Sequence, residues 1–169
     1  MNSTVKTILS YLSIILFVII IRLFIITPII VNGNSMNDTL YSNDIMILNI
    51  VGYHTSGVKR FDIVVIKYGN EHIIKRVIGL PGEIVKYRNG LLYVNGKNIK
   101  EPFIDQKTAD FSTTTLIKDG IVPSDTYFVL GDNRNDSYDS RYIGFIKKDN
   151  IMGKTNLILF PFKHIKIIK

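Results

Sequence analysis

An apolar run close to the N-terminus constrains this chain more than any other feature. Residues 8–27 contain a single charged side chain, Arg22. As an α-helix this run is about 30 Å long, the thickness of the hydrocarbon core of a bilayer. Arg22 lies near the far end of the run, where a long side chain reaches the membrane interface at low cost. Because Pro28 disfavours helix at the residue before it, the pattern predicts a transmembrane helix over 7–28.

Two other interpretations of this run remain open. Residues 1–6 followed by apolar residues also resemble a secretory signal, but cleavage needs small residues of the Ala-x-Ala type, and the only Ala in the sequence is Ala109. A buried core helix is the second alternative, since apolar runs of about 10–14 residues fit both environments. Lys6, without an acidic neighbour in the tail, favours a cytoplasmic N-terminus. We therefore expect residues 1–6 to be a short cytoplasmic tail of a single-pass protein of the cell membrane.

The rest of the chain, residues 29–169, has the pattern of an extracytoplasmic β domain. Short β-branched or aromatic runs are bounded by Gly, Asn, Asp or Pro, which is typical of strands joined by turns. These runs are 45–51, 63–66, 73–77 and 127–130. Asn-Gly pairs follow 83–88 and 91–94, and Asn-Gly is a strong hairpin signal, so a β-meander is expected. The predicted fold class is mainly β, an antiparallel β-sheet domain preceded by one N-terminal transmembrane helix.

Composition narrows the chemistry. The chain has 169 residues, enough for one ordinary domain and a short appendage. Because the chain contains no Cys, disulfides, thiolate zinc sites and cysteine nucleophiles are excluded. The net charge of +7 suits an anionic membrane surface as well as nucleic acid. The chemistry must therefore come from polar clusters in the loops between strands.

The first such cluster is residues 32–40, directly after the predicted membrane exit. Gly33 and its Asn neighbours allow a sharp turn that presents the hydroxyl of Ser35 together with its own backbone N–H. A serine nucleophile and half of an oxyanion hole are built in this way. An ordinary polar turn between span and domain is the alternative interpretation.

The second cluster contains Lys75 and Arg76, side by side in an otherwise apolar strand. Alternation along a strand places them on opposite faces, so the one that faces inward is desolvated. A desolvated Lys loses its proton more easily than a free one, and a neutral amine is a competent general base. Arg76 stays charged and needs water or a partner. The alternative for Lys75 is a solvated position on an edge strand.

The third cluster is the loop 131–141, which contains three Asp, two Arg, two Ser and two Asn. It lacks the Gly and the final Glu of an EF-hand loop, so rigid support of an active site is favoured over a calcium site. A histidine-based site is disfavoured, because His72 lies three residues before Lys75 in a strand and the two side chains then point to opposite faces.

Together these clusters resemble the bacterial type I signal peptidases (leader peptidases), membrane-bound serine proteases with a Ser–Lys dyad, in a compact form like that of Gram-positive bacteria. The resemblance rests on five segments in the same order. These are the apolar run, residues 33–36, the strand from Asp62, residues 75–82 and residues 131–141. It implies cleavage of signal peptides from secretory preproteins after small residues, beside the membrane, with no cofactor, metal or nucleic acid involved. Oligomeric state is not implied.

The resemblance also implies residue roles. Ser35 would be the nucleophile and Lys75 the general base, with the backbone N–H groups of Gly33 and Ser35 as the oxyanion hole. Ser137 would orient Lys75. The remaining support positions are Asp132, Arg134, and Asp139 paired with Arg141. The positions expected to line the substrate cleft are Ile29, Val31, Met36, Leu40 and Ile74.

One departure from the family pattern lies close to the nucleophile. Many members have Pro where this chain has Asp38, which puts substrate specificity, rather than mechanism, in question. A signal-peptidase-like protein dedicated to pilin or other surface-protein assembly, including a non-proteolytic chaperone module, is the alternative function. The presence of both Ser35 and Lys75 favours the peptidase. Self-cleaving repressor proteases share this chemistry but carry a DNA-binding region in place of the apolar run.

Overall fold

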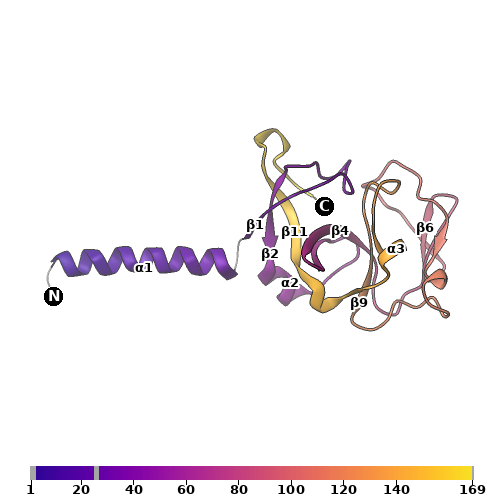
Figure 1. Cartoon of the computed structure of the whole chain (residues 1–169), viewed down its shortest axis with the longest axis horizontal. Helices are drawn as coiled ribbons and strands as arrows, with labels where there is room; N and C mark the ends of the chain where they lie inside the picture. The colour runs from indigo at the N-terminus through magenta and orange to yellow at the C-terminus, as the bar shows by residue number, and fades with distance from the viewer. Residues whose placement is uncertain (1–2, 25–26, 169) are drawn as a thin grey trace.

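A long N-terminal helix extends away from a β domain (Figure 1). The computed structural model describes residues 3–24 and 27–168, with the backbone alone for residues 20–24. Helix α1 (Ser3–Phe24) contains no Gly or Pro, and its described side chains, at 3–19, are all exposed. It begins and ends four residues earlier than predicted. Thr27 and Pro28 belong to strand β1 instead, because Pro restricts the residue before it to extended conformations.

The prediction that this helix crosses a membrane is not confirmed. Within residues 3–24 and 27–168, no helix combines the length and the apolarity that a membrane crossing requires.

The β domain is built from two antiparallel sheets. The larger sheet has the order β1-β2-β11-β3-β4-β9-β10, and β12 pairs with β11. Its strands are β1 (Thr27–Ile30), β2 (Ile45–Asn49), β3 (Ile63–Tyr68), β4 (Glu71–Gly79), β9 (Thr126–Leu130), β10 (Ile146–Lys147), β11 (Ile151–Phe160) and β12 (Lys166–Ile167). The smaller sheet has the order β7-β6-β5-β8. Its strands are β5 (Val85–Arg88), β6 (Leu91–Val94), β7 (Lys97–Ile99) and β8 (Phe111–Ser112).

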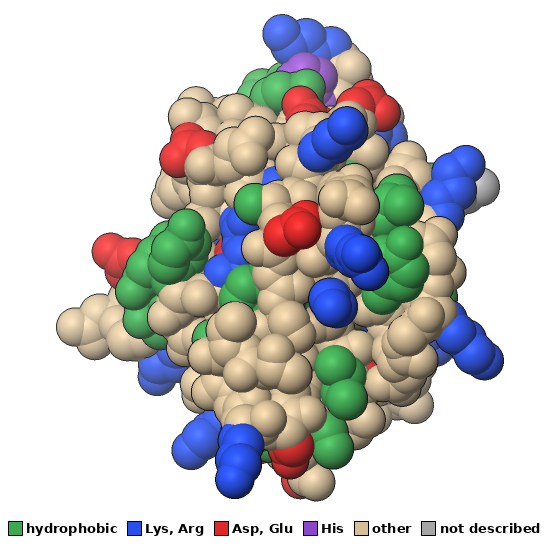
Figure 2. Space-filling view, turned by 90° about the vertical axis from the view of Figure 1, so that its right-hand side faces the viewer, with side chains coloured by type: hydrophobic (Ala, Val, Ile, Leu, Met, Phe, Trp, Pro, Cys, Tyr) green, Lys and Arg blue, Asp and Glu red, His purple; other side chains and the backbone are tan. Residues whose placement is uncertain are grey.

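Helical segments in the domain are short. They are α2 (Ile50–Ser56), α3 (Ser140–Ile143), and the 3-10 turns η1 (Thr113–Thr115), η2 (Lys148–Asn150) and η3 (Phe162–His164). Figure 2 shows the end of the molecule opposite α1, where Lys and Arg side chains are spread among small separate groups of hydrophobic ones.

The antiparallel, mainly β prediction is confirmed, and so is the β-meander. Both residues of each Asn-Gly turn have positive φ, 52° and 81° at 89–90 and 50° and 78° at 95–96, as type I′ hairpins require. The predicted strand 45–51 is two residues too long. Ile50 begins α2, because the Asn49 side chain accepts a hydrogen bond from Gly52 N and caps the helix.

Strand β4 positions the site because its two halves have different neighbours. Residues 71–76 pair with β3, whereas β9 pairs only with Arg76 and the residues after it. Among residues 3–24 and 27–168, the N-terminal half of β4 therefore has one edge without a strand. Strand β1 is the first strand in the order of the same sheet, and its outer edge likewise has no strand among these residues.

Strand β4 also carries a buried ion pair with the loop 131–141. Arg76 and Asp132 are both fully buried and joined by two hydrogen bonds, Nε to Oδ1 at 2.8 Å and Nη2 to Oδ2 at 2.6 Å. Arg76 Nη1 donates to the Phe61 carbonyl at 2.9 Å, and the guanidinium lies 3.9 Å from the centre of the Phe103 ring. Arg76, whose charge is predicted to need water or a partner, thus has the buried carboxylate of Asp132 as its partner.

Removal of this partner tests how much the fold depends on it. Asp132→Asn leaves the Arg76 charge buried without its carboxylate, so we expect a loss of about 3–5 kcal/mol in the free energy of unfolding, measured by denaturant titration. Asp136→Asn, an exposed position in the same loop, is the control and should change stability by less than about 0.5 kcal/mol. Equal stability of the two variants would contradict the prediction.

Candidate active site

The structure brings Ser35 and Lys75 into direct contact, although 40 residues separate them. Lys75 Nζ lies 2.6 Å from Ser35 Oγ. Ser35 is on the turn between β1 and β2, and Lys75 is in the middle of β4 with 3% of its surface exposed. A hydroxyl and a buried amine within hydrogen-bond distance have the geometry that a serine nucleophile and its base require.

Local sequence explains the shape of the turn that carries Ser35. Gly33 has φ of +86°, which side chains with a Cβ rarely adopt. Met36 and Leu40 anchor the turn in the core, and both are almost fully buried. Asp38 has φ of 80°, a conformation closed to Pro, whose ring fixes φ near −65°. The backbone at this position therefore does not allow the Pro of the family pattern.

Burial lowers the pKa of the Lys75 ammonium below its ordinary value, because the charged form is desolvated. The negative charges of Asp139 and Asp132 partly oppose this shift, and the positive charge of Arg141 adds to it. A larger fraction of Lys75 is therefore neutral near neutral pH than of an exposed lysine, and the neutral amine can accept the hydroxyl proton of Ser35.

The loop 131–141 is held by charged side chains that each have a partner. Asp139 and Arg141 form an ion pair at 2.8 Å, and Asp139 also accepts from Gly131 N at 3.1 Å. Arg134 pairs with Glu101 at 2.8 Å and donates to Tyr87 Oη at 2.9 Å. Sequence reasoning missed Glu101 and Tyr87, since nothing in their local pattern marks them as partners of a loop more than 30 residues away.

Ser137 lies beside the dyad but does not make the bond expected of it. Its Oγ is buried and has no hydrogen-bond partner within the described ranges 3–24 and 27–168. Ser137 Oγ and the Ser35 carbonyl oxygen both crowd the position that a Cβ on Gly131 would take. Gly131 is thus required for the close approach of the loop to the nucleophile turn.

The two backbone N–H groups predicted as oxyanion donors belong to Gly33 and Ser35. In the part of the chain that the structure describes, neither of them donates a hydrogen bond to another backbone group. An N–H without an acceptor is what an oxyanion hole requires. The Ser35 carbonyl, in contrast, accepts from Asn133 N at 3.1 Å, and the Asn34 carbonyl accepts from Asn133 Nδ2 at 3.1 Å. Asn133 is a second residue that sequence reasoning did not single out.

A groove of about 760 Å³ leads to the dyad. Ser35, Lys75, Ile29 and Ile74 are among its lining residues, and it includes β1 together with the N-terminal half of β4. Of the other positions predicted to line it, Val31, Met36 and Leu40 do not. They are buried in the core with Met46, Ile63 and Ile158, because the turn directs its apolar side chains inward. His72 is exposed at the groove and makes no recorded contact with Lys75 within the described residues.

Comparisons with known proteins show the family of this chain. The family described as signal peptidase, peptidase S26, matches residues 4–160. Signal peptidase I of Bacillus caldolyticus is 42% identical over 85% of this chain and 84% of its own length. Signal peptidase IB of Staphylococcus aureus (strain COL) is 40% identical over 87% and 84%. The crystal structure of a signal peptidase I from Enterococcus faecalis V583 superimposes with a TM-score of 0.54 at 40% identity, covering 57% of this chain and 95% of that one.

The antiparallel β fold and the family match together place the protein among the peptidases, which are hydrolases. The chain belongs to the signal peptidase family, peptidase S26. It is accordingly an enzyme, a peptidase that acts on the signal peptides of secretory preproteins.

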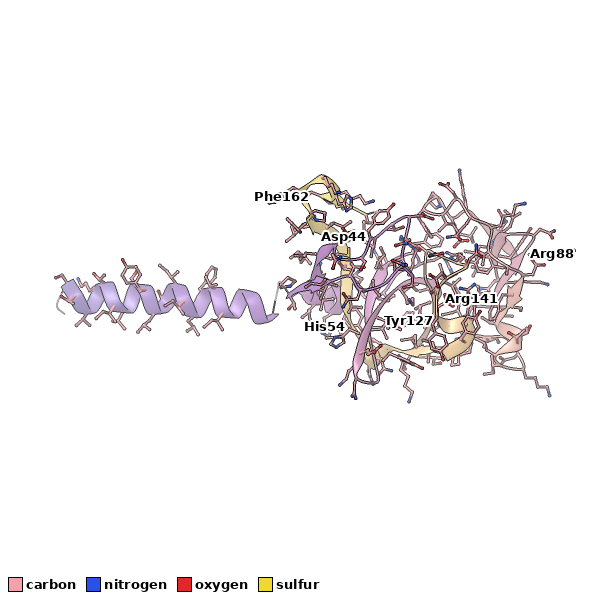
Figure 3. The ribbon with its side chains drawn as sticks, turned by 45° about the horizontal axis from the view of Figure 1, so that its top comes forward. Asp44, His54, Arg88, Tyr127, Arg141 and Phe162 are labelled. Atoms are coloured by element: carbon pink, nitrogen blue, oxygen red, sulfur yellow. The ribbon has the colours of Figure 1, made fainter. Side chains whose placement is uncertain are left out.

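The charges around Lys75 predict how a variant shifts the pH profile. Arg141→Gln removes a charge that lowers the pKa of Lys75 and leaves Asp139, which raises it, without its partner. Because the base must be neutral, the rising limb of rate against pH is expected to move to higher pH, with activity recovering in alkali. Arg88→Gln, an exposed position on β5 at the far end of the domain (Figure 3), removes the same charge as a control. If the rising limb of the rate against pH did not move in Arg141→Gln, this result would contradict Lys75 as the base.

Proposed function

We propose that this protein is a membrane-bound serine endopeptidase that cleaves signal peptides from secretory preproteins after small residues, at Ala-x-Ala sites. Ser35 is the nucleophile and Lys75 the general base. The observation that carries the proposal is the 2.6 Å contact between Ser35 Oγ and the Nζ of a buried lysine whose pKa is lowered. The function of the family and the order of its motifs support the same assignment.

In the proposed reaction, neutral Lys75 Nζ accepts the hydroxyl proton as Ser35 Oγ attacks the scissile carbonyl carbon. The carbonyl oxygen becomes an oxyanion, which the Ser35 N–H stabilises. The Lys75 ammonium then gives its proton to the leaving amine, the C–N bond breaks, and an ester to Ser35 remains. Water, deprotonated by Lys75, attacks this ester, the bond between the acyl carbon and Ser35 Oγ breaks, and the Lys75 ammonium returns its proton to Ser35 Oγ. The signal peptide leaves with a free carboxylate.

The substrate is proposed to bind as an extended strand. Within the described residues, β1 and the N-terminal half of β4 each have an edge without a strand, and both lie along the groove. A peptide added there would gain main-chain hydrogen bonds from both sides. Ile29 and Ile74 in the lining would then leave room for small side chains before the scissile bond, which fits an Ala-x-Ala preference.

Membrane attachment is also part of the proposal, with residues 1–6 in the cytoplasm and the domain outside. Helix α1 supports it through its exposed apolar side chains, such as Ile14 at 55% and Phe17 at 63%. The β11–β12 hairpin supports it as well, since Phe162 is 79% exposed and lies at the end of the domain from which α1 leaves (Figure 3). Lys163 and Lys166 on the same hairpin suit anionic headgroups.

The dyad is tested with a preprotein that carries an Ala-x-Ala site and mass spectrometry of the products. Ser35→Ala and Lys75→Ala are each expected to lose at least about a thousandfold in rate, because the two groups act as a unit. Ser124→Ala and Lys67→Ala, both exposed, are matched controls that keep activity. Full activity in Ser35→Ala would overturn the assignment, and an inactive wild type would favour the assembly-module alternative.

Membrane attachment is tested by alkaline carbonate extraction of membranes from cells that express the full chain. The wild type is expected to stay in the membrane pellet. Replacement of Ile14 and Phe17 by Asp puts charges into the apolar helix and should release the protein. Ile117→Asp, at a partly exposed position in the β domain, should stay in the pellet. Release of the wild type under the same conditions would contradict an embedded helix.

A further inference from the structure

A single residue of the loop 131–141 holds both carbonyl groups that flank Ser35. Asn133 Nδ2 donates to the Asn34 carbonyl oxygen at 3.1 Å. The backbone N–H of Asn133 donates to the carbonyl oxygen of Ser35 itself, also at 3.1 Å. The nucleophile therefore lies between two peptide groups that are fixed from the same side by one residue, 98 positions further along the chain.

The first of these bonds acts on the peptide group that supplies the oxyanion donor. The Asn34 carbonyl and the Ser35 N–H belong to one planar, trans peptide unit, so their C=O and N–H bonds point in opposite directions. A donor that fixes the carbonyl on one side also fixes the direction of the N–H on the other. That N–H has no acceptor within the described residues, and Ser35 lines the groove.

We propose that Asn133 is a positioning residue for the oxyanion hole. Its side-chain amide fixes the Asn34–Ser35 peptide so that the Ser35 N–H is directed away from the loop and toward the oxyanion that forms during cleavage. The inference rests on the proposed function, because it requires Ser35 as the nucleophile. Asn133 touches neither the substrate nor the reacting atoms and acts only through this peptide group.

Two further features strengthen the role. Asn37 N–H also donates to the Asn34 carbonyl at 3.0 Å, and donors on a carbonyl polarise the amide and make its N–H a stronger donor. The backbone of Asn133 is itself held in place by its neighbour, since Asp132 is paired with Arg76 and its carbonyl accepts from Gln106 Nε2 at 2.9 Å. The backbone of Asn133 is therefore held rigidly, as precise catalytic geometry requires.

The test compares Asn133→Ala with Asn150→Ala in the full-length protein. Asn150 is the control, because it is the same residue type, is exposed on η2 and lies outside the loop 131–141. For Asn133→Ala we expect kcat about tenfold lower, the effect of one lost hydrogen bond on the transition state. KM, the position of the pH limb set by Lys75 and the thermal midpoint should match those of the control.

A peptide aldehyde built on the residues before the cleavage site gives a second readout. Ser35 Oγ bonds to its carbonyl carbon, the C=O bond becomes C–O⁻, and the hydroxyl proton goes to Lys75. Asn133→Ala should weaken aldehyde binding by the same factor as kcat/KM, while binding of the matching peptide alcohol, which forms no adduct, stays unchanged.

Each outcome decides the proposal. Equal kcat in Asn133→Ala and Asn150→Ala, or a loss that appears only in KM or as a shifted pH limb, would overturn the positioning role. The proposed dyad would still stand as long as Ser35→Ala is inactive in the same assay. Full activity of Ser35→Ala would overturn both proposals, so the two failures are distinguishable.

Discussion

The buried ion pair between Arg76 and Asp132 is the interaction on which the rest of the structure depends. It joins the middle of β4 to the start of the loop 131–141 with two hydrogen bonds and no exposure to solvent. Lys75 precedes one partner in sequence and Asn133 follows the other. A single pair therefore fixes the positions of Lys75, the proposed base, and of Asn133, which contacts the turn that carries Ser35, relative to each other. Desolvation of the two charges is costly, and the pair persists because the geometry is bidentate and the remaining donors reach the Phe61 carbonyl and Thr39 Oγ1.

The same strand shows why two adjacent basic residues differ in chemistry. Lys75 and Arg76 lie on opposite faces of β4, and both faces are covered, so both side chains are buried. Arg76 has a carboxylate against its guanidinium, whereas none of the ion pairs among the described residues includes Lys75. Burial without a carboxylate in contact favours the neutral amine, and burial with one keeps the guanidinium charged. A structural cation and the proposed base thus lie at neighbouring positions of one strand.

Local patterns predicted the parts of the fold that local chemistry decides. Each Asn-Gly pair encodes its own turn, and Pro28 excludes helix at Thr27 whatever the rest of the chain does. The failures concern contacts between distant segments. Val31, Met36 and Leu40 were placed in the cleft by resemblance, but their exposure depends on how the turn packs against β2, β3 and β11. Glu101 and Asn133 became relevant only once the fold brought them to Arg134 and to the Ser35 turn. The contact of Ser35 with Lys75 was expected from the resemblance alone, since nothing in either local pattern specifies the other.

Asp38 links these observations. Where many signal peptidases have Pro close to the nucleophile, this chain has a residue with φ of 80°, which Pro cannot adopt. The turn therefore lacks the stiffness that a proline ring supplies and depends on hydrogen bonds instead. Asn37 and Leu40 N–H groups close it from within, and Asn133 holds it from the loop 131–141. Because Arg76–Asp132 and Asp139–Arg141 in turn fix that loop, the precision of the nucleophile turn depends on ion pairs of which Ser35 is not a member.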